Sequence, residues 1–464
     1  MKYDEFNVQS LSIGHFWQYI GNNNMKISDE ICPKYSLSMK KLLLCILTLT
    51  AYSLLQAQPT LEQCKEKARE HYPLIRQYDL ISQSEEFNLT NISRTWLPQI
   101  SMGVQATYQS DVAQWPEQFE SMLAAQGLDM PGLRKDQYKV QIDVQQTIWD
   151  GGKSRSDRQI ASLEAEQSRR SLEVELYSVE SRVEDIYFGI LLLQEQERQI
   201  EEMIGRLKNN LNYVNSLVEA GVAMQSDADA VEVQVLSSNQ KLMQVRANEE
   251  SFRKMLSMFV GEAIGDSPLT APVAVEPLVM DSFRPELHMF DSQIDLLNAK
   301  KKSANLAITP KFGLFAQGYY GYPGLNMFEN MMSSQWSLNG IIGVRMSWNI
   351  SGFYTTRNAK RQIDNAIDGI DLNRDIFNFN TRLQVEKENA EIRRLREALK
   401  DDDRIVELRT RVRQASEARL EEGEIDMNDL LMKISDETAA SIDRSTREIE
   451  LLKAIYDLKH TLNR

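Results

Sequence analysis

Few residues of this chain have the types and spacing that catalysis or metal binding requires. Cys64 has no neighbouring base and stands among charged residues, which predicts an inert thiol. The segment GYYGYPG at 318–324 fits neither a dinucleotide-binding nor a phosphate-binding loop, and the DDD run at 401–403 is typical of a solvated helix face or a kink. Metal-ligand motifs such as HxxxH and HExxH are absent around the four histidines, which are His15, His71, His288 and His460. The sequence therefore predicts no enzyme, no metal site and no cofactor.

The composition excludes two further classes of protein. The chain has 464 residues and a formal net charge of −14, whereas a nucleic-acid-binding protein needs a basic surface. Hydrophobic residues make up 42% of the chain, which argues against bulk disorder.

Residues 39–57 have the pattern of a secretory signal peptide. Met39 and two lysines precede the apolar run LLLCILTLTAYSLL, and Ala57 suits the cleavage site. A buried core helix is the alternative, but the two lysines favour export, and the run is short for a membrane span. We expect residues 1–38 to be a non-native extension, with Met39 as the true first residue. The exported chain then begins at Gln58, which offers no thiol for lipid attachment, and Cys64 is its one cysteine, so no internal disulfide is expected.

A long helix is predicted at 153–218, followed by a return helix at 225–260. Gly221 suits the end of the first helix, and Ser226 or Asp227 suits the N-cap of the second. Apolar residues recur in steps of four and three, with one miss at Glu197, which is the heptad pattern of a coiled coil about 100 Å long. They are Leu172, Leu176, Val179, Val183, Ile186, Ile190, Leu193, Ile200, Ile204, Leu207, Leu211, Val214 and Val218.

The second half of the chain repeats the plan of the first. Trp149 corresponds to Trp348 and Gly221 to Gly423, and ITPKFGLFAQGYY echoes WLPQISMGVQATY. We therefore expect two repeats, at 58–280 and 281–464, the second with a long helix at 353–421 and a return helix at 425–462. A shorter helix opens each repeat, at about 60–95 and 286–306. In each repeat the two shorter helices are expected to lie end to end beside the long one.

Four segments, at about 99–109, 138–149, 311–320 and 336–349, alternate apolar and polar residues as strands do. One alternative is a soluble sheet with its apolar face on a core. The helices, however, use their apolar stripes on one another, and each strand is long enough to cross a bilayer at a tilt. Aromatic residues near the strand ends suit a membrane interface, namely Tyr108, Trp149, Tyr319, Tyr320, Trp336 and Trp348. We therefore expect the apolar face to contact outer-membrane lipid.

A sheet in lipid must close on itself, because an open edge leaves backbone groups unpaired. Four strands are too few to enclose a lumen, since small membrane barrels begin at about eight strands. Several copies of the chain are therefore expected to pool their strands, with the polar faces lining a water-filled lumen.

The chain resembles the TolC-type outer-membrane efflux proteins over about residues 58–464. The resemblance is carried by TLEQCKEKAREHYPLIRQ, WLPQIS, QTIWDGGKSRSD and the two turns EAGVAMQSDADAVEVQV and EEGEIDMNDLLMKISD. It implies a mainly helical fold with a small β part. Three copies would form a twelve-stranded outer-membrane barrel and a periplasmic tunnel of long antiparallel coiled-coil helices. It also implies a Gram-negative outer-membrane location and docking to a periplasmic adaptor and an inner-membrane transporter of the resistance or ABC class.

The resemblance also implies roles for the two turns. In the family such turns meet the adaptor tip, and here they carry acids where a basic residue is common. The matching residues are Val218, Glu219, Ala220, Gly221, Leu420, Glu421, Glu422 and Gly423.

Asp426 and Asp429 follow the second turn and are candidates for an acidic aperture ring. The family places gating aspartates six and nine residues past the glycine. Asp429 fits the first position, but Met432 occupies the second. Asp429 could equally be an ordinary acid in the first turn of a helix, where it interacts favourably with the helix dipole.

The function that the sequence favours is a passive exit duct of a tripartite efflux system. The same fold serving type I protein secretion is an alternative. A soluble periplasmic coiled-coil scaffold is an alternative from another class of protein.

Overall fold

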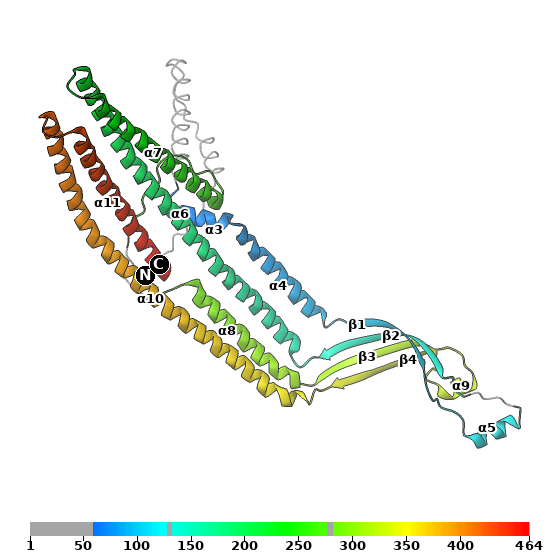
Figure 1. The fold of residues 1–464 in the computed structure, drawn as a ribbon. Helices are drawn as coiled ribbons and strands as arrows, with labels where there is room; N and C mark the ends of the chain where they lie inside the picture. The colour runs from blue at the N-terminus through cyan, green and yellow to red at the C-terminus, as the bar shows by residue number, and fades with distance from the viewer. Residues whose placement is uncertain (1–58, 128–131, 274, 276–281, 464) are drawn as a thin grey trace, which may run out of the picture. The chain divides into compact units, whose positions relative to one another are not determined.

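The computed structural model describes residues 59–464 except 128–131, 274, 276–281 and 464. The predicted extension and signal peptide lie outside the described residues. Pro59–Arg464 forms one unit, which consists of long helices and a four-stranded antiparallel sheet, as the sequence predicted (Figure 1).

Both halves of the chain follow the same plan, except that the first helix is divided into α3 and α4 in the first half. The first half contains α3 (Leu61–His71), η1 (Pro73–Arg76), α4 (Gln77–Arg94), β1 (Gln99–Tyr108), α5 (Glu117–Ala124), β2 (Asp136–Trp149), α6 (Lys153–Glu219) and α7 (Gln225–Val260). The second half contains α8 (Pro285–Ala304), η2 (Asn305–Ile308), β3 (Lys311–Tyr322), α9 (Met327–Met332), β4 (Ser337–Ser347), α10 (Gly352–Glu421) and α11 (Met427–Leu462).

Three local features differ from the sequence-based expectation. The first helix is broken between α3 and α4 at Pro73, because proline lacks the amide hydrogen that would continue the helix. The short helices α5 and α9 lie in the connections between strands, where no regular structure was expected. Helix α7 has Met224 as its N-cap, and Asp227 instead accepts the Met224 amide from the first turn at 3.0 Å.

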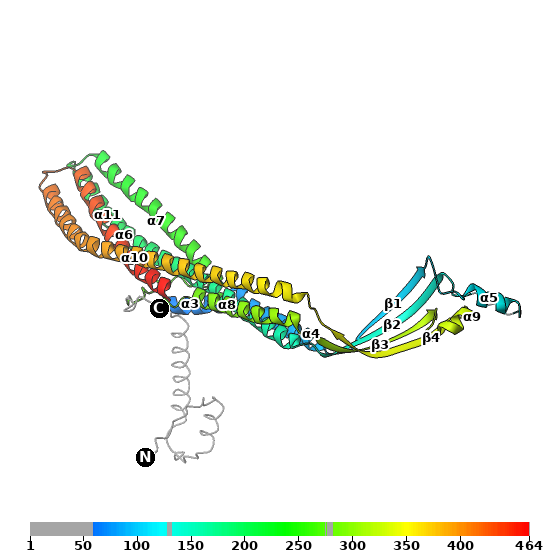
Figure 2. The same cartoon turned by 90° about the horizontal axis from the view of Figure 1, so that it is seen from below.

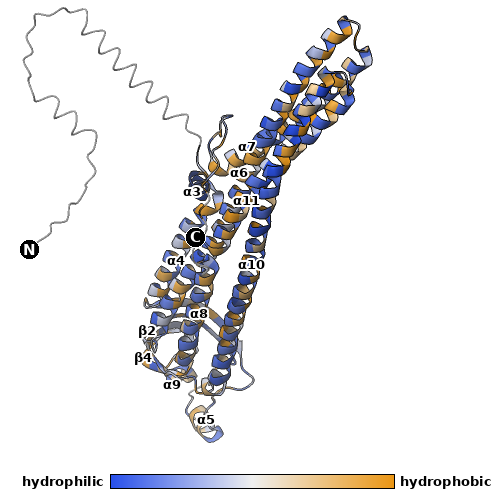
Figure 3. Ribbon diagram, turned by 90° about the vertical axis from the view of Figure 1, so that its left-hand side faces the viewer, coloured by the Kyte–Doolittle hydropathy of each residue, from blue (hydrophilic) through white to orange (hydrophobic). Residues whose placement is uncertain are grey.

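The heptad pattern marks the buried face of α6. Leu176, Val183 and Leu207 are fully buried, and Val183 and Leu207 each belong to a hydrophobic cluster shared with neighbouring helices. One cluster joins α6 to α3 and the end of α7, and a second joins α6 to the starts of α7 and α11. Apolar and polar residues are interspersed along the helices, as amphipathic packing requires (Figure 3).

The helices form a layer with two free edges. Beside the sheet, α4 packs on α6, α6 on α8 and α8 on α10. Farther from the sheet, α7 packs on α6, α6 on α11 and α11 on α10. In each repeat the two shorter helices lie along the long helix. In the second repeat they are joined where the Phe283 amide donates to Leu462 O at 3.0 Å. Figure 2 shows the strand order β1-β2-β3-β4, which matches the order α4-α6-α8-α10 in which the helices pack.

The register places most apolar residues of the four strands on one face. Ile142 of β2 is opposite Met102 of β1, and Val144 is opposite Ile100. Leu314 of β3 lies opposite Val344 of β4. Directly opposed residues share a face, so the alternation within each strand adds up to one apolar surface.

A bulge at Ile148 changes the face of the last residues of β2. Thr147 pairs with Gly313, and the next pair is Trp149 with Phe312. The extra residue brings the Trp149 ring to 5.7 Å from the Phe312 ring on the apolar side. Strict alternation had instead put Ile148 on the apolar face.

The WDGGKS segment makes a tight joint between β2 and α6. Both Asp150 carboxylate oxygens accept amides of the turn, from Gly152 at 2.9 Å and from Ser154 at 2.6 Å. Gly151 has φ +72°, and a Cβ there would lie 2.1 Å from Thr309 Oγ1. This close approach holds the β2–α6 joint against the α8–β3 joint of the other repeat.

We expect Gly151→Ala to lower stability by more than Gly152→Ala. Both positions have positive φ, which costs an alanine about 1 kcal/mol, but a Cβ at Gly152 meets nothing within 4 Å. The difference therefore isolates the clash with Thr309. Urea unfolding of the two purified variants, followed by circular dichroism, measures it. Equal midpoints would contradict a tight joint.

Candidate functional site

The apolar face of the sheet is exposed in the single chain. Val104 of β1 is 75% exposed, and Leu338 and Ile342 of β4 are 82% and 81% exposed. Among the described residues the strands pack chiefly on one another, and Tyr322 at the end of β3 packs against Met331 of α9. An apolar surface of this extent requires an apolar environment. Among the described residues, no helix is both long and apolar enough to cross a membrane.

Aromatic residues gather at both ends of the apolar face. At the end far from the helices, Trp336 lies 6.3 Å from Tyr138 and 5.5 Å from Tyr320, measured between ring centroids. Trp149 lies at the helical end. Trp336 and Trp348 flank β4 and are twelve residues apart. That separation is about 40 Å along a strand and about 30 Å across a bilayer at a tilt of about 40°.

Tyr319 does not belong to these aromatic bands, contrary to the sequence-based expectation. It lies opposite Gln141 and Asn339, on the polar face. The ammonium group of Lys139 lies 6.0 Å from its ring centroid. The sequence placed Tyr319 near a strand end but did not fix its face.

The polar face of the sheet carries a short hydrogen-bond network. Asp143 accepts the side-chain amides of Gln141 at 2.8 Å and Gln317 at 2.7 Å. The residues opposite these positions, Ser101 and Gly103, are small. A polar, hydrogen-bonded surface opposite an apolar one suits a sheet with water on one side and lipid on the other.

The two turns at the other end of the helices have the same backbone conformation. The amide after each glycine reaches back to the last turn of its helix, from Val222 to Leu217 O at 2.8 Å and from Glu424 to Arg419 O at 2.9 Å. Gly221 and Gly423 have φ +71° and +74°. Both turns are thus helix C-caps that need glycine in the left-handed region.

The side chains of the two turns differ in chemistry. In the first turn, Val222 and Met224 are 75% and 74% exposed. In the second turn the corresponding positions are Glu424, which pairs with Arg419 at 3.0 Å, and Asp426. The first turn is therefore apolar at its tip and the second is charged.

Asp426 and Asp429 take different places at the start of α11. Asp426 is the N-cap, and its carboxylate accepts the Asp429 amide at 2.8 Å. The Asp429 side chain is exposed, and no carboxylate contact is recorded for it among the described residues. Asp426 is therefore engaged in capping, and Asp429 is the carboxylate of the two that is free to interact outside the chain.

A buried carboxylate joins three helices above the turns. Glu437 of α11 has a side chain only 4% exposed and forms ion pairs with Arg206 of α6 at 2.7 Å and Arg413 of α10 at 2.5 Å. Arg413 also pairs with Glu417 at 2.6 Å. Burial lowers the pKa of the Arg413 guanidinium, but these carboxylates outweigh it and raise the pKa above its usual range. This cluster ties the two coiled coils together.

Cys64 is buried and His460 is half-buried where α3, α6 and α11 meet. Burial raises the pKa of the Cys64 thiol to about 11. The His460 ring stacks on Tyr177 at 4.1 Å, and burial, with Arg284 and Lys65 nearby, lowers its pKa to about 4. Both groups are packed in their neutral forms. Among the described residues, no cluster of histidine, cysteine and carboxylate ligands could hold a metal ion.

We expect Glu437→Gln to cost about 2 kcal/mol of stability, because it removes the charge of a buried carboxylate that pairs with both Arg206 and the largely buried Arg413. Asp436→Asn is the matched control. Its partner Arg409 lies 2.6 Å away and both side chains are over 40% exposed, so the cost is at most about 1 kcal/mol. Urea unfolding monitored by circular dichroism compares the two. Similar midpoints would exclude Glu437 as a structural tie.

One family model matches part of the chain. The outer membrane efflux protein family matches residues 66–261, which extend from α3 to the end of the first repeat's return helix. A comparison with curated protein sequences found no match.

Solved outer-membrane channels share the fold over both repeats. The channel OprN is 16% identical with a TM-score of 0.63, covering 87% of this chain and 90% of OprN. The Campylobacter jejuni channel CmeC is 12% identical with a TM-score of 0.61, covering 87% of this chain and 86% of CmeC. The Neisseria gonorrhoeae channel MtrE, in its open state, is 14% identical with a TM-score of 0.59, covering 88% and 89%. The sequence match in the first repeat and the fold shared across both repeats thus confirm the resemblance to outer-membrane efflux proteins.

Proposed function

We propose that the chain is the outer-membrane exit duct of a tripartite efflux system in a Gram-negative bacterium. Three copies would form a passive channel that receives solutes from an inner-membrane transporter and its periplasmic adaptor. The observation that carries the proposal is the uncovered apolar face of the sheet, bounded by aromatic residues at both ends. A lipid bilayer fits both the chemistry and the height of that surface.

The edges of the sheet support closure by further copies of the chain. All three strand pairs are antiparallel, so the outer strands β1 and β4 run in opposite directions. The β4 edge of one copy can therefore pair with the β1 edge of the next and continue an antiparallel sheet. A head-to-tail contact of this kind closes into a ring. The resemblance to the family sets the number of copies at three.

The helical edges carry apolar stripes that suit the same assembly. On α10, exposed apolar residues follow steps of four, three and four, and α4 exposes Leu80 and Phe87, each 63%. The α10 residues are Leu372 at 60%, Ile376 at 49%, Phe379 at 62% and Leu383 at 55%. Heptad stripes at both edges of a helical layer favour coiled-coil contacts between neighbouring copies.

The two turns are the proposed contact with the adaptor, through Val218–Gly221 and Leu420–Gly423. They lie at the opposite end of the helices from the sheet. The exposed Val222 and Met224 side chains next to the first segment are an apolar surface without a cover in the single chain.

Membrane fractionation with gel migration before and after boiling tests the proposal. We expect an outer-membrane oligomer that resists detergent and dissociates on heating. A soluble monomer would instead indicate a periplasmic scaffold. Loss of drug resistance in a deletion strain, with normal secretion of proteins, would separate efflux from type I secretion.

We expect Asp429→Ala to raise single-channel conductance in a planar bilayer. Three exposed Asp429 carboxylates around a narrow aperture would hold the constriction through bridges to neighbouring copies, and alanine removes these bridges, so the aperture widens.

Asp227→Ala is the matched control for this experiment. Asp227 is the corresponding residue of the first repeat, and its carboxylate already accepts the Met224 amide at 3.0 Å. Its loss is expected to leave conductance unchanged. Equal conductance of Asp429→Ala and the unaltered channel would leave Asp429 as an ordinary first-turn acid.

A further inference from the structure

The polar face of the sheet carries two unpaired cations near its helical end. Lys311 of β3 lies opposite Ser347, and Gly313 lies opposite Arg345 of β4, which places both basic side chains on the polar face. Both are exposed. Among the residues that the structure describes, neither has a carboxylate within 4.0 Å.

An aromatic ring lies beside these cations on the same polar face. The Arg345 guanidinium is 4.8 Å from the centroid of the Phe315 ring. Phe315 is opposite Gly343, where a Cβ would lie only 2.8 Å from the ring. The glycine thus leaves room for a phenylalanine in a water-facing position, next to a cation.

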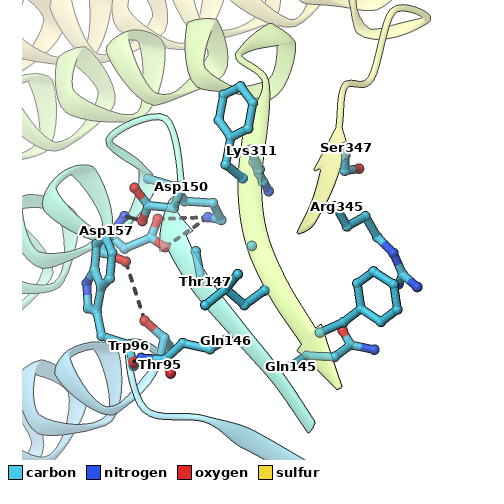
Figure 4. A pocket seen from close by; sticks show the side chains of 16 residues that line it. Thr95, Trp96, Gln145, Gln146, Thr147, Asp150, Asp157, Lys311, Arg345 and Ser347 are labelled. Carbon is cyan, nitrogen blue, oxygen red and sulfur yellow. Dashed lines mark hydrogen bonds and ion pairs between the residues drawn. The ribbon is translucent and has the colours of Figure 1, made fainter. Parts of the chain in front are cut away.

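A cavity of about 290 Å³ brings these side chains together at the joint between sheet and helices (Figure 4). Thr147, Lys311, Phe315, Arg345 and Ser347 are among its lining residues. Lys153 also lines it, but its ammonium group is held by Asp157 at 2.9 Å. Lys311 and Arg345 therefore provide the cationic groups of the cavity that no carboxylate pairs with among the described residues.

The charge of the polar face is opposite to that of the chain. Its strand residues include three cations, Lys139, Lys311 and Arg345, and one acid, Asp143, which gives a net charge of 3 − 1 = +2. The whole chain carries −14. Asp143 is hydrogen-bonded to Gln141 and Gln317. In a narrow lumen with low-dielectric walls, a local positive charge of this kind concentrates anions.

We propose that this surface binds anionic amphipathic solutes as they leave through the duct. The proposal rests on the proposed function, in which the polar face lines the lumen. Arg345 and Lys311 bind the sulfonate, sulfate or carboxylate group, and Phe315 contacts the apolar body of the solute. In a trimer the two cations per chain form a ring of 2 × 3 = 6 positive charges between barrel and tunnel.

Planar-bilayer recording with the purified full-length oligomer tests the proposal, with pyrene-1-sulfonate as the anionic probe. We expect the sulfonate to block the current and 1-pyrenemethylammonium to block it at least tenfold less well. In the double variant Arg345→Gln, Lys311→Gln, block by the sulfonate is expected to weaken by about tenfold or more, because two charge-assisted contacts are lost. The reversal potential in a salt gradient is expected to shift toward cation selectivity.

Lys302→Gln is the control, because it removes an exposed cation from α8 outside this cavity. It is expected to keep both the block and the selectivity. The anion site would be overturned if both probes blocked the channel equally, or if block were unchanged in the double variant. Either result would leave the proposed channel function intact. The absence of any current from the unaltered protein would overturn both.

Discussion

The backbone groups at the two edges of the sheet are the constraint on which the rest of the proposed assembly depends. In lipid an unpaired amide or carbonyl costs several kcal/mol, so β1 and β4 cannot remain edges if the apolar face contacts a membrane. The even number of strands makes the two edges complementary. Each strand is connected to the helix that holds the same position in the helical layer. Pairing of strands between copies therefore also brings α10 of one copy toward α4 of the next. The contacts that close the sheet would therefore also close the helical tunnel.

The helices satisfy their backbone hydrogen bonds in a different way from the strands. A coiled coil satisfies its backbone hydrogen bonds internally and needs only its apolar stripe covered. Its polar residues can therefore form ion pairs between helices, such as Arg206 with Glu437 and Arg246 with Glu197. Among the described residues no ion pair joins one strand to another, and the strands use hydrogen bonds and aromatic contacts instead. The three residues Asp150–Gly152 form the joint between strand β2 and helix α6.

The sequence was sufficient for the features that depend on periodicity. Alternation located all four strands, and the heptads of α6 located its buried face, because burial repeats with the period of each element. It was insufficient where one residue changes the local geometry. The bulge at Ile148 and the polar-face position of Tyr319 depend on which residues the neighbouring strand opposes. The same holds for the pairing of Phe315 with Gly343 and Arg345, which are far apart in the sequence.

Duplication explains why the two turns agree in backbone but not in side chains. Gly221 and Gly423 are constrained by a positive φ that other residues adopt only at a cost, so both copies need glycine. The next positions point outward and carry no such constraint, and they hold Val222 and Met224 in one copy and Glu424 and Asp426 in the other. In the proposed trimer, apolar and acidic tips therefore alternate around the ring. A partner built from identical units would therefore meet apolar and acidic turns alternately. Its contact with this end of the duct must either accommodate both kinds of turn or use only the apolar turns.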